Sequence, residues 1–280
     1  MPELPEVERV RQSLAARAVG RGVRAVEVRR PGVVRGDRST TALLAGHRIT
    51  AIERLGKQLA ILGSPVDTTM GEEPRCLCIH LGMTGSLCVV TNDNSPRKHI
   101  HVVWHLDDGS RIEFRDPRRF GGIWVYPNKA ELLKHRWRHL GADALRISPA
   151  ELYAALHQTR RPIKAALLDQ EIIAGLGNIY VDELLFGCGI HPLSRSDRLS
   201  LEQFRGLVPR MKRLLRRAIT AGGSSLRDYV DANGQAGEFQ LSHRVYGRRG
   251  LPCRTCGKAL SHTRVGGRMT VFCVSCQKRY

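Results

Sequence analysis

The sequence contains no apolar run that approaches the roughly 20 residues needed to span a membrane as a helix. Its N-terminus, Met-Pro-Glu-Leu-Pro-Glu, has neither the basic segment nor the apolar segment of a signal peptide. Internal repeats and low-complexity segments are also missing. These absences predict a soluble protein of the cytoplasm that has no membrane partner.

Acidic residues are scarce relative to basic ones. The chain of 280 residues has 26 Asp and Glu against 45 Lys and Arg, which gives a net charge of +19. Such an excess indicates a polyanionic partner, most commonly nucleic acid, although a generically basic ribosomal or chromatin protein has the same signature. The segment 242–280 is the extreme case, because it has nine Lys or Arg and no Asp or Glu.

The first half of the chain combines one helix with many short strands. Residues 6–18 predict a helix, because Val7, Val10 and Leu14 share one face. From residue 23 to about residue 126, short runs of Val, Ile and Leu alternate with Gly, Pro and Asp, which favours an all-β sandwich or barrel. The expected strands are 23–28, 49–55, 59–62, 77–81, 101–106, 111–114 and 123–126.

Beyond about residue 140 the pattern becomes helical. Residues 162–169 and 178–186 have helical spacing, and the clearest helix begins after Ser200, where Gln203 completes a capping box. A chain of this length with 42% hydrophobic residues suits two domains and a small appendage. The sequence therefore predicts an α+β fold with a boundary near residues 141–149.

Four of the eight cysteines have the spacing of a metal site. Cys253-x2-Cys256 and Cys273-x2-Cys276 are separated by sixteen residues, which is typical of a four-thiolate structural zinc site and less typical of two redox pairs. Four thiolates leave no position for water, so we expect one structural Zn²⁺ per chain with no catalytic role. The other four lie in apolar stretches, which predicts buried thiols: Cys76, Cys78, Cys88 and Cys188.

Six motifs occur in the order found in one enzyme family. The chain resembles the formamidopyrimidine-DNA glycosylases, also called MutM-type 8-oxoguanine-DNA glycosylases, over nearly its whole length. The motifs are Pro2–Glu6, Gly56-Lys57, His80–Ser86, Asp116–Gly121, Ala174–Tyr180, and the cysteine-rich tail with Arg268 before Cys273. One departure is Arg9, which stands where the family usually has a polar residue.

The resemblance implies a division of the chain into three folded parts. Residues 1–140 would form a catalytic β-sandwich domain with a leading helix, followed by a linker over 141–148. Residues 149–241 would form a helix–two-turn–helix DNA-binding domain, and residues 242–280 a zinc-finger β-hairpin. The implied partner is damaged double-stranded DNA, bound by a monomer, so the protein would associate with the nucleoid when it acts.

The implied nucleophile is the amine of Pro2 after removal of Met1. Attack at the sugar C1′ atom needs an unprotonated amine, and an α-amine with a pKa of about 7.7–8.0 is partly free near neutral pH, whereas a lysine amine is mostly charged. The Schiff base of a secondary amine is an iminium, which withdraws electrons and favours elimination of the phosphates. The implied activity is therefore that of a bifunctional glycosylase and lyase, which removes oxidised purines and then cuts the strand by β,δ-elimination.

Further roles follow from the family pattern. Glu3 would be the general acid and Glu6 a supporting member of the same site, although two acids at a helix start also occur for purely structural reasons. Lys57 would approach the phosphate and transfer a proton during β-elimination. Arg268 would bind the phosphates that flank the lesion and assist δ-elimination.

The remaining matches concern DNA contacts. Asn178 would clamp a phosphate at a helix start. Because the target nucleotide must leave the duplex, apolar or planar side chains would fill the gap that it leaves. The void-filling residues would be Met83, Arg118 and Phe120, the last two forming one wedge, and the phosphate contacts would be His99, Arg118, Arg160, Arg161 and Lys164.

Two alternatives stay open at this point. Endonuclease VIII, a sister enzyme for oxidised pyrimidines, usually has glycine where this chain has Leu4. The Arg118 and Phe120 wedge and the Val245–Arg248 lead-in to the zinc finger resemble the purine-specific branch. A non-catalytic zinc-ribbon factor for DNA or RNA would explain the charge and the cysteines, but it assigns no role to Pro2, Glu3 or Lys57. The segment 222–237 is expected to include the loop that covers the flipped base.

Overall fold

The computed structural model describes residues 2–67, 73–91, 97–226 and 229–280. The chain forms two compact units, Met1–Arg138 with Ala221–Glu238, and His139–Thr220 with Phe239–Tyr280. This mixture of strands and helices agrees with the predicted α+β class. The grouping differs from the predicted domain boundaries, because segment 221–238 joins the first unit and the cysteine-rich tail joins the helical residues of the second.

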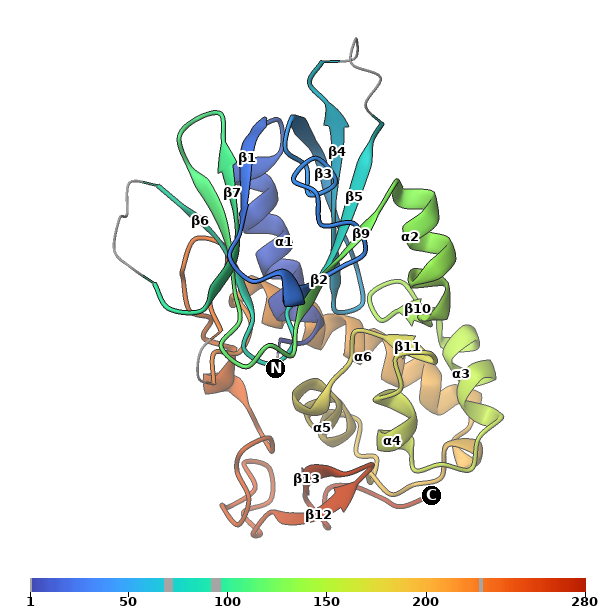
Figure 1. The fold of residues 1–280 in the computed structure, drawn as a ribbon. Helices are drawn as coiled ribbons and strands as arrows, with labels where there is room; N and C mark the ends of the chain where they lie inside the picture. Colours follow the sequence, from blue (N-terminus) through green and yellow to red (C-terminus); the bar gives the residue numbers. More distant parts are fainter. Residues whose placement is uncertain (1, 68–72, 92–96, 227–228) are drawn as a thin grey trace. The chain divides into compact units, whose positions relative to one another are not determined.

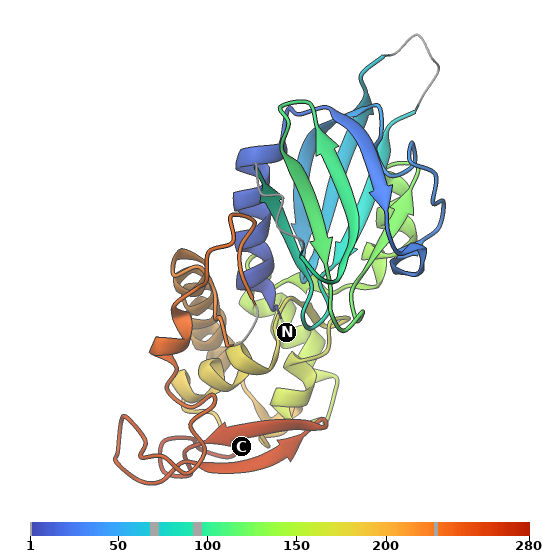
Figure 2. The same cartoon turned by 60° about the vertical axis from the view of Figure 1, so that its left-hand side comes forward.

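Two sheets form the body of the first unit (Figures 1 and 2). One has the strand order β1-β7-β8-β6 and the other the order β2-β9-β5-β4-β3, and all pairs are antiparallel except β2 with β9. The first sheet contains β1 (Val23–Val28), β6 (Ser86–Val90), β7 (Ile100–Leu106) and β8 (Arg111–Arg115). The second contains β2 (Val34–Arg35), β3 (His47–Leu55), β4 (Gln58–Pro65), β5 (Arg75–His80) and β9 (Gly122–Tyr126). The sequence runs predicted seven of these strands but not β2 or β6.

Helix α1 (Leu4–Ala18) packs against strands of both sheets. Its predicted face is correct, since Val7, Val10 and Leu14 are all buried in the core that the two sheets share. The helix begins earlier than the apolar spacing indicates, because Pro5 suits the first turn of a helix and Glu3 takes the N-cap position. Sequence patterning missed α2 (Lys129–His135), whose N-cap Asn128 accepts a hydrogen bond from Glu131 N–H.

Helices form the body of the second unit. They are α3 (Pro149–His157), α4 (Ile163–Leu167), α5 (Asn178–Gly187) and α6 (Leu201–Thr220), with the short pair β10 (Ala142–Asp143) and β11 (Ile173–Ala174). The predicted capping box is present, because Ser200 and Gln203 exchange side-chain to backbone hydrogen bonds at the start of α6. None of the described helices is both long and apolar enough to cross a membrane.

The cysteine-rich tail packs on α5. Strands β12 (Ser261–Val265) and β13 (Arg268–Phe272) form a hairpin whose turn, Gly266-Gly267, has φ angles of +55° and +72°, a conformation that suits glycine. A small apolar cluster joins the tail to α5, and it includes Phe186, Leu260 and Val271. The position of β13, and of Arg268 at its start, is therefore tied to the helical residues.

Candidate functional site

Two buried carboxylates lie at the start of α1, Glu3 at the N-cap position and Glu6 in the first turn. Pro2 is buried, and Glu3 and Glu6 are only 3% and 1% exposed. One oxygen of the Glu6 carboxylate accepts the Glu3 backbone N–H at 2.8 Å. Glu6 thus holds the backbone at Glu3, next to Pro2, and these are the two residues expected to react.

Hydrogen bonds from Ser224 and Tyr229 connect segment 221–238 to the same turn. The second oxygen of Glu6 accepts the Ser224 N–H at 2.7 Å, and the Tyr229 hydroxyl donates to the Glu6 carbonyl at 3.1 Å. Gly223 has a φ of +85°, and a Cβ there would lie 2.9 Å from the Glu6 side chain. This close approach requires glycine, so the loop expected to cover the flipped base is anchored on Glu6.

A second anchor lies one to two turns further along α1. The Arg9 guanidinium pairs with Asp231 at 3.1 Å, and Ser13 Oγ accepts the Ala232 N–H at 3.0 Å. Asp231 shapes the loop itself, because it also accepts the N–H groups of Asn233 and Gln235. Sequence reasoning noticed Arg9 only as a departure from the family pattern, and pattern alone could not supply its partner 222 residues away.

Lys57 lies in the turn between β3 and β4 and is 8% exposed. The positive charge of Lys57 acts on His80, which lies at the end of β5. Burial, together with the positive charges of Arg136 and Lys57, lowers the pKa of His80 to about 4. His80 is therefore neutral near pH 7, and its Nδ1 atom accepts the Gly82 N–H at 3.1 Å.

The three predicted void-filling residues lie on two adjoining turns, Met83 on one and Arg118 and Phe120 on the other. Met83 is 39% exposed and Phe120 is 56% exposed, so both apolar side chains are accessible to a partner. The Arg118 guanidinium lies 4.9 Å from the centre of the Phe120 ring. The backbones of the turns touch, since a Cβ on Gly82 would lie 2.4 Å from Gly121 N.

Asp116 joins these two turns. It is fully buried, accepts the Thr84 hydroxyl at 2.8 Å and accepts the Gly121 N–H at 2.7 Å. Its own N–H donates to the carbonyl of His99, which has a φ of +67°. The family resemblance implies no role for Asp116, although an acid before Pro at a turn is a recognisable signal in the sequence.

In the second unit, Asn178 begins α5 beside the cysteine-rich tail. Its Nδ2 atom donates to the Met269 carbonyl at 3.0 Å, while its Oδ1 atom is buried with no hydrogen-bond partner. Gly175, with a φ of +113°, donates its N–H to the Gln170 side-chain oxygen. The helix N-terminus and the start of β13 are therefore adjacent, which suits joint contacts with phosphates.

Lys164 does not fit its predicted role. The side chain is completely buried, and its ammonium pairs with Asp182 at 2.6 Å and donates to the Met269 carbonyl at 3.2 Å. A lysine that is engaged inside the protein cannot also neutralise a phosphate. The packing around α4 turns this residue inward, and its burial gives no support to the predicted phosphate contact.

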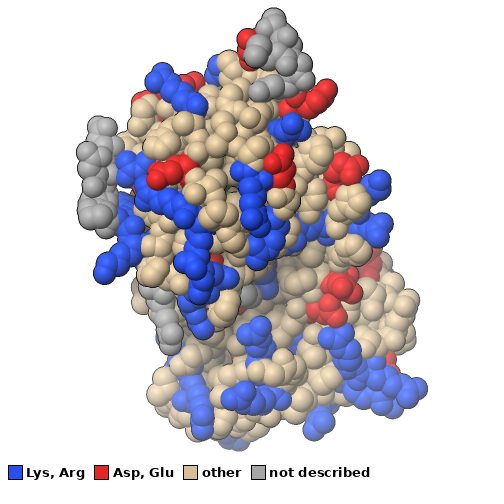
Figure 3. Space-filling model, viewed as in Figure 1, with Lys and Arg blue, Asp and Glu red and all other residues tan. Residues whose placement is uncertain are grey.

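The other basic candidates remain at the surface. Arg268 and Arg160 are exposed, and neither takes part in an ion pair among the described residues. Arg161 is also exposed, but its guanidinium pairs with Asp169 at 2.7 Å. Figure 3 shows Lys and Arg side chains spread over parts of both units, as expected for a polyanion-binding protein.

The four paired cysteines form a metal site. Their Sγ atoms all lie within 4.8 Å of one another, and the pairs Cys253–Cys276 and Cys256–Cys273 are 3.9 and 3.5 Å apart. Thiolates at about 2.3 Å from a tetrahedral ion would be about 3.8 Å apart, so the cluster fits this geometry. No other such cluster occurs in the part of the chain that the structure describes.

The remaining cysteines lie apart from this site. Cys76, Cys78 and Cys88 are buried and Cys188 is half-buried. Burial raises the pKa of the Cys78 thiol to about 11 and that of the Cys188 thiol also to about 11. Both groups are neutral thiols near pH 7. The predicted burial is correct for Cys76, Cys78 and Cys88, whereas Cys188 is only partly buried.

Three family models together match almost the whole chain. Residues 1–123 match the formamidopyrimidine-DNA glycosylase N-terminal domain, and residues 140–230 match the formamidopyrimidine-DNA glycosylase H2TH domain. Residues 250–279 match the zinc finger found in FPG and IleRS. The order of the three matches is the order of the motifs in the sequence.

Curated proteins and solved structures agree with these matches. The chain is 39% identical to the formamidopyrimidine-DNA glycosylase of Bacillus licheniformis and 37% identical to that of Bacillus subtilis, with 100% of each chain covered. The crystal structure of MutM (FPG) from Thermus thermophilus is 35% identical with a TM-score of 0.85, also over 100% of both chains. A Lactococcus lactis Fpg in complex with abasic-site-containing DNA is 31% identical with a TM-score of 0.86, over 99% of this chain and 100% of that one.

Proposed function

Because this chain belongs to the formamidopyrimidine-DNA glycosylase family, we propose that it removes oxidised purines from double-stranded DNA and then cleaves the strand by β,δ-elimination. The substrates would be 8-oxoguanine and formamidopyrimidines. The observation that carries the proposal is the buried Pro2–Glu3–Glu6 turn with its loop contact at Ser224. Burying carboxylates costs free energy, and a non-catalytic nucleic-acid-binding protein would gain no activity from doing so at its N-terminus.

Pro2 would act as the nucleophile once Met1 is removed. Its nitrogen forms a bond to C1′ of the damaged nucleotide, the sugar ring opens, and the base leaves with its bonding electron pair and gains a proton. The product is an iminium between the proline nitrogen and C1′. Glu3 would supply a proton in this step, and Glu6 would hold Glu3 through the hydrogen bond to its N–H.

The lyase steps would follow from the iminium. Loss of a proton from C2′ expels the 3′ phosphate, and a second elimination expels the 5′ phosphate, so each step breaks one C–O bond. Lys57 would transfer a proton in the first elimination. Arg268 would neutralise the phosphates that depart, and its exposed position at the start of β13 supports this role.

Contacts with DNA would come from both units. Met83, Arg118 and Phe120 would fill the gap that the flipped nucleotide leaves, which their exposure on two fixed turns supports. Asn178 and Arg160 would bind phosphates, as would His99 on the turn next to Asp116. Arg161 would do so only after release from Asp169.

The ion held by the four cysteines would be Zn²⁺. An all-thiolate tetrahedral set suits zinc, and with all four positions taken the ion would have a structural role. Cys253, Cys256, Cys273 and Cys276 would hold it and thereby keep the β12–β13 hairpin folded. The protein would act as a monomer in the cytoplasm, associated with the nucleoid while it is bound to DNA.

The test is covalent trapping. Borohydride added during reaction with an 8-oxoguanine duplex should reduce the iminium and leave a stable adduct between the Met1-processed protein and DNA. Tandem mass spectrometry of the digested adduct should locate the linkage at Pro2, and the alkylated Pro2 nitrogen should block Edman sequencing. The absence of an adduct, or a linkage at a lysine, would contradict the mechanism.

A parallel assay addresses the substrate class. Duplexes with an oxidised pyrimidine should be trapped much more slowly than duplexes with 8-oxoguanine. Faster trapping on the pyrimidine would favour the endonuclease VIII alternative. The curated relatives described above carry the purine-type name, which supports the first expectation.

A further inference from the structure

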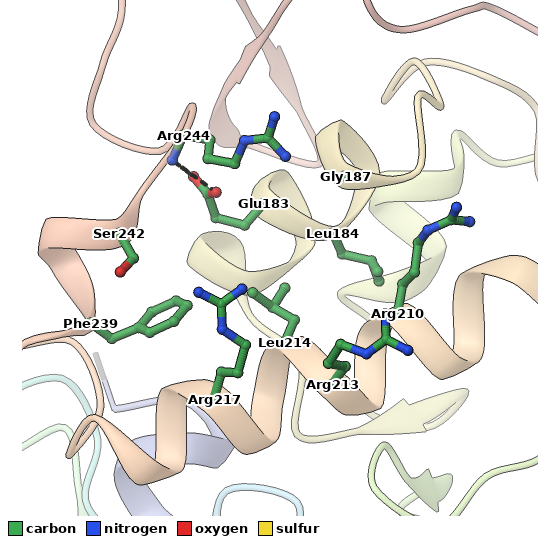
Figure 4. Close-up of a pocket in the computed structure, with 10 residues that line it drawn as sticks. All are labelled: Glu183, Leu184, Gly187, Arg210, Arg213, Leu214, Arg217, Phe239, Ser242 and Arg244. Atoms are coloured by element: carbon green, nitrogen blue, oxygen red, sulfur yellow. Dashed lines mark hydrogen bonds between the residues drawn. The ribbon is translucent and has the colours of Figure 1, made fainter. Parts of the chain in front are cut away.

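A cavity in the second unit has no role in the proposed reaction. Its volume is about 290 Å³, and it lies between α5, α6 and the short helix η5 (Phe239–Ser242) with the residues that follow it (Figure 4). This volume is just below the range of roughly 300–1,000 Å³ found for small-molecule pockets. The cavity therefore suits one or two side chains of a peptide.

The lining is basic at the rim and apolar inside. Arg210, Arg213 and Arg217 come from α6, where a spacing of three, four and seven residues places them on one face. Figure 4 shows Arg217 reaching toward Phe239 and Leu214. The apolar lining is Leu184, Leu214 and Phe239.

The positive charge of this rim is not balanced within the protein. All three α6 arginines are exposed, and none has a carboxylate partner among the ion pairs of the described residues. The single acid of the lining, Glu183, is 5% exposed and accepts the backbone N–H groups of Arg244, Val245 and Tyr246. Glu183 thus already has partners, and an incoming anion would meet mainly guanidinium groups.

The cavity is separate from the residues expected to bind DNA in the same unit. It contacts α5 at Glu183, Leu184 and Gly187, whereas Asn178 begins that helix. At 1.5 Å per residue, these contacts lie roughly 8–14 Å along the axis from Asn178. The candidate phosphate contacts, Arg268 included, are absent from the lining.

We propose that this cavity docks an acidic segment of a partner protein, with one apolar side chain inserted against Leu184, Leu214 and Phe239. Carboxylates on either side of that side chain would pair with the arginines of α6, which are suited to bidentate contacts. Leu241, between two lining residues of η5, is 72% exposed and offers further apolar contact. A DNA duplex matches the arginines, but its backbone has no projecting apolar side chain that could be inserted into the cavity, so the lining favours a peptide.

The test uses a fluorescein-labelled peptide of about twelve residues, made of Asp and Glu around one central Phe. Anisotropy is measured with the full, metal-loaded chain, in the presence of a saturating duplex with an uncleavable abasic analogue that occupies the DNA site. We expect the peptide to bind under these conditions, and its affinity to fall with salt. A peptide with Ser in place of Phe should bind more weakly.

Charge reversal on α6 identifies the site. Arg213→Glu with Arg217→Glu should weaken peptide binding at least about tenfold. Arg216→Glu is the matched control, because Arg216 is exposed on the same helix but does not line the cavity, and its effect should stay below about twofold. Glycosylase activity of the double variant on 8-oxoguanine duplex should equal that of the parent, which shows that the variant is folded.

Three results would overturn the proposal. Displacement of the peptide by the duplex would place it on the DNA interface. Equal losses in the double variant and in Arg216→Glu would mean general attraction to a basic surface. Tighter binding of a single-stranded oligonucleotide of equal charge, lost in the same double variant, would assign the cavity to nucleic acid.

Discussion

The ammonium group of Lys164 lies 2.6 Å from the carboxylate of Asp182, and both side chains are excluded from solvent. The pair joins α4 to α5 and also reaches β13. Lys164 donates to the Met269 carbonyl, and the second oxygen of Asp182 accepts the Val271 N–H at 3.2 Å. Arg268 precedes Met269 in the chain, so a buried ion pair positions the strand that presents this arginine.

Breaking this pair should destabilise the second unit strongly. Lys164→Met leaves the Asp182 carboxylate buried without its partner, a situation that typically costs about 3–5 kcal/mol. Urea unfolding followed by far-UV circular dichroism would measure the loss. The double substitution Lys164→Met with Asp182→Leu should recover most of it, because no unpaired charge then remains. A loss below about 1 kcal/mol in the single variant, as for a surface pair, would contradict this account.

Gly223→Ala should lower glycosylase activity more than the matched change Gly234→Ala. Both glycines have positive φ angles, +85° and +79°, so both substitutions add backbone strain of about 1–3 kcal/mol. Only the Cβ at Gly223 meets Glu6, while the one at Gly234 meets nothing within 4 Å. Single-turnover excision rates compare the two, and equal rates would show that the contact with Glu6 has no effect on the reaction.

Stability of the first unit should fall between about pH 6.5 and pH 4 because of His80. Burial lowers the pKa of this histidine to about 4, so in that interval the unfolded chain binds a proton that the folded chain does not. The free energy of unfolding therefore decreases as the pH falls. His80→Gln should remove this part of the pH dependence, and His105→Gln, at an exposed position of β7, should leave it unchanged.

Tryptophan fluorescence isolates the first unit in this measurement, since Trp104, Trp124 and Trp137 all belong to it. Protonated His80 can no longer accept the Gly82 N–H at Nδ1, so the Met83 turn would lose a bond as well. An identical pH profile for His80→Gln and the parent would contradict the assignment.

Arg268→Ala should reduce the salt dependence of DNA binding by about one unit of slope in log K against log [salt], since one phosphate contact is lost. The control is Arg264→Ala, on the neighbouring strand β12 and also exposed. Fluorescence anisotropy with a duplex that holds an uncleavable abasic analogue gives both slopes. Equal slopes for the two variants would remove the phosphate role from Arg268.

Removal of the metal should abolish DNA binding and leave the first unit folded. The apolar cluster that joins the tail to α5 includes Cys253 and Cys273, so loss of the ion should also loosen helices of the second unit. Chelation should therefore reduce the helical circular dichroism signal while tryptophan fluorescence stays native. A simultaneous change in both signals would mean that the two units unfold together.

Much of the fold and of the site could be predicted from local patterns. Period-two runs identified most strands, one apolar face identified α1, and paired cysteines identified the metal site, because in each case the controlling residues are close in sequence or identical in type. Helices α2 and α3 were missed, although Asn128 and Ser148 are ordinary N-cap residues, because their apolar faces are short. An apolar face that repeats along a long helix is easier to recognise in a sequence than one that extends over only one or two turns.

The six motifs of the sequence by themselves determined the family and the chemistry expected of Pro2, Glu3 and Lys57. Tertiary structure alone decided the partners of those residues: Ser224 reaches Glu6 across 218 residues, and Asp231 reaches Arg9 across 222. It also decided that Lys164 points inward, toward Asp182, and not toward a phosphate. A basic residue near other basic residues looks the same in sequence whether it is exposed or buried, since burial depends on packing between segments that sequence order does not bring together.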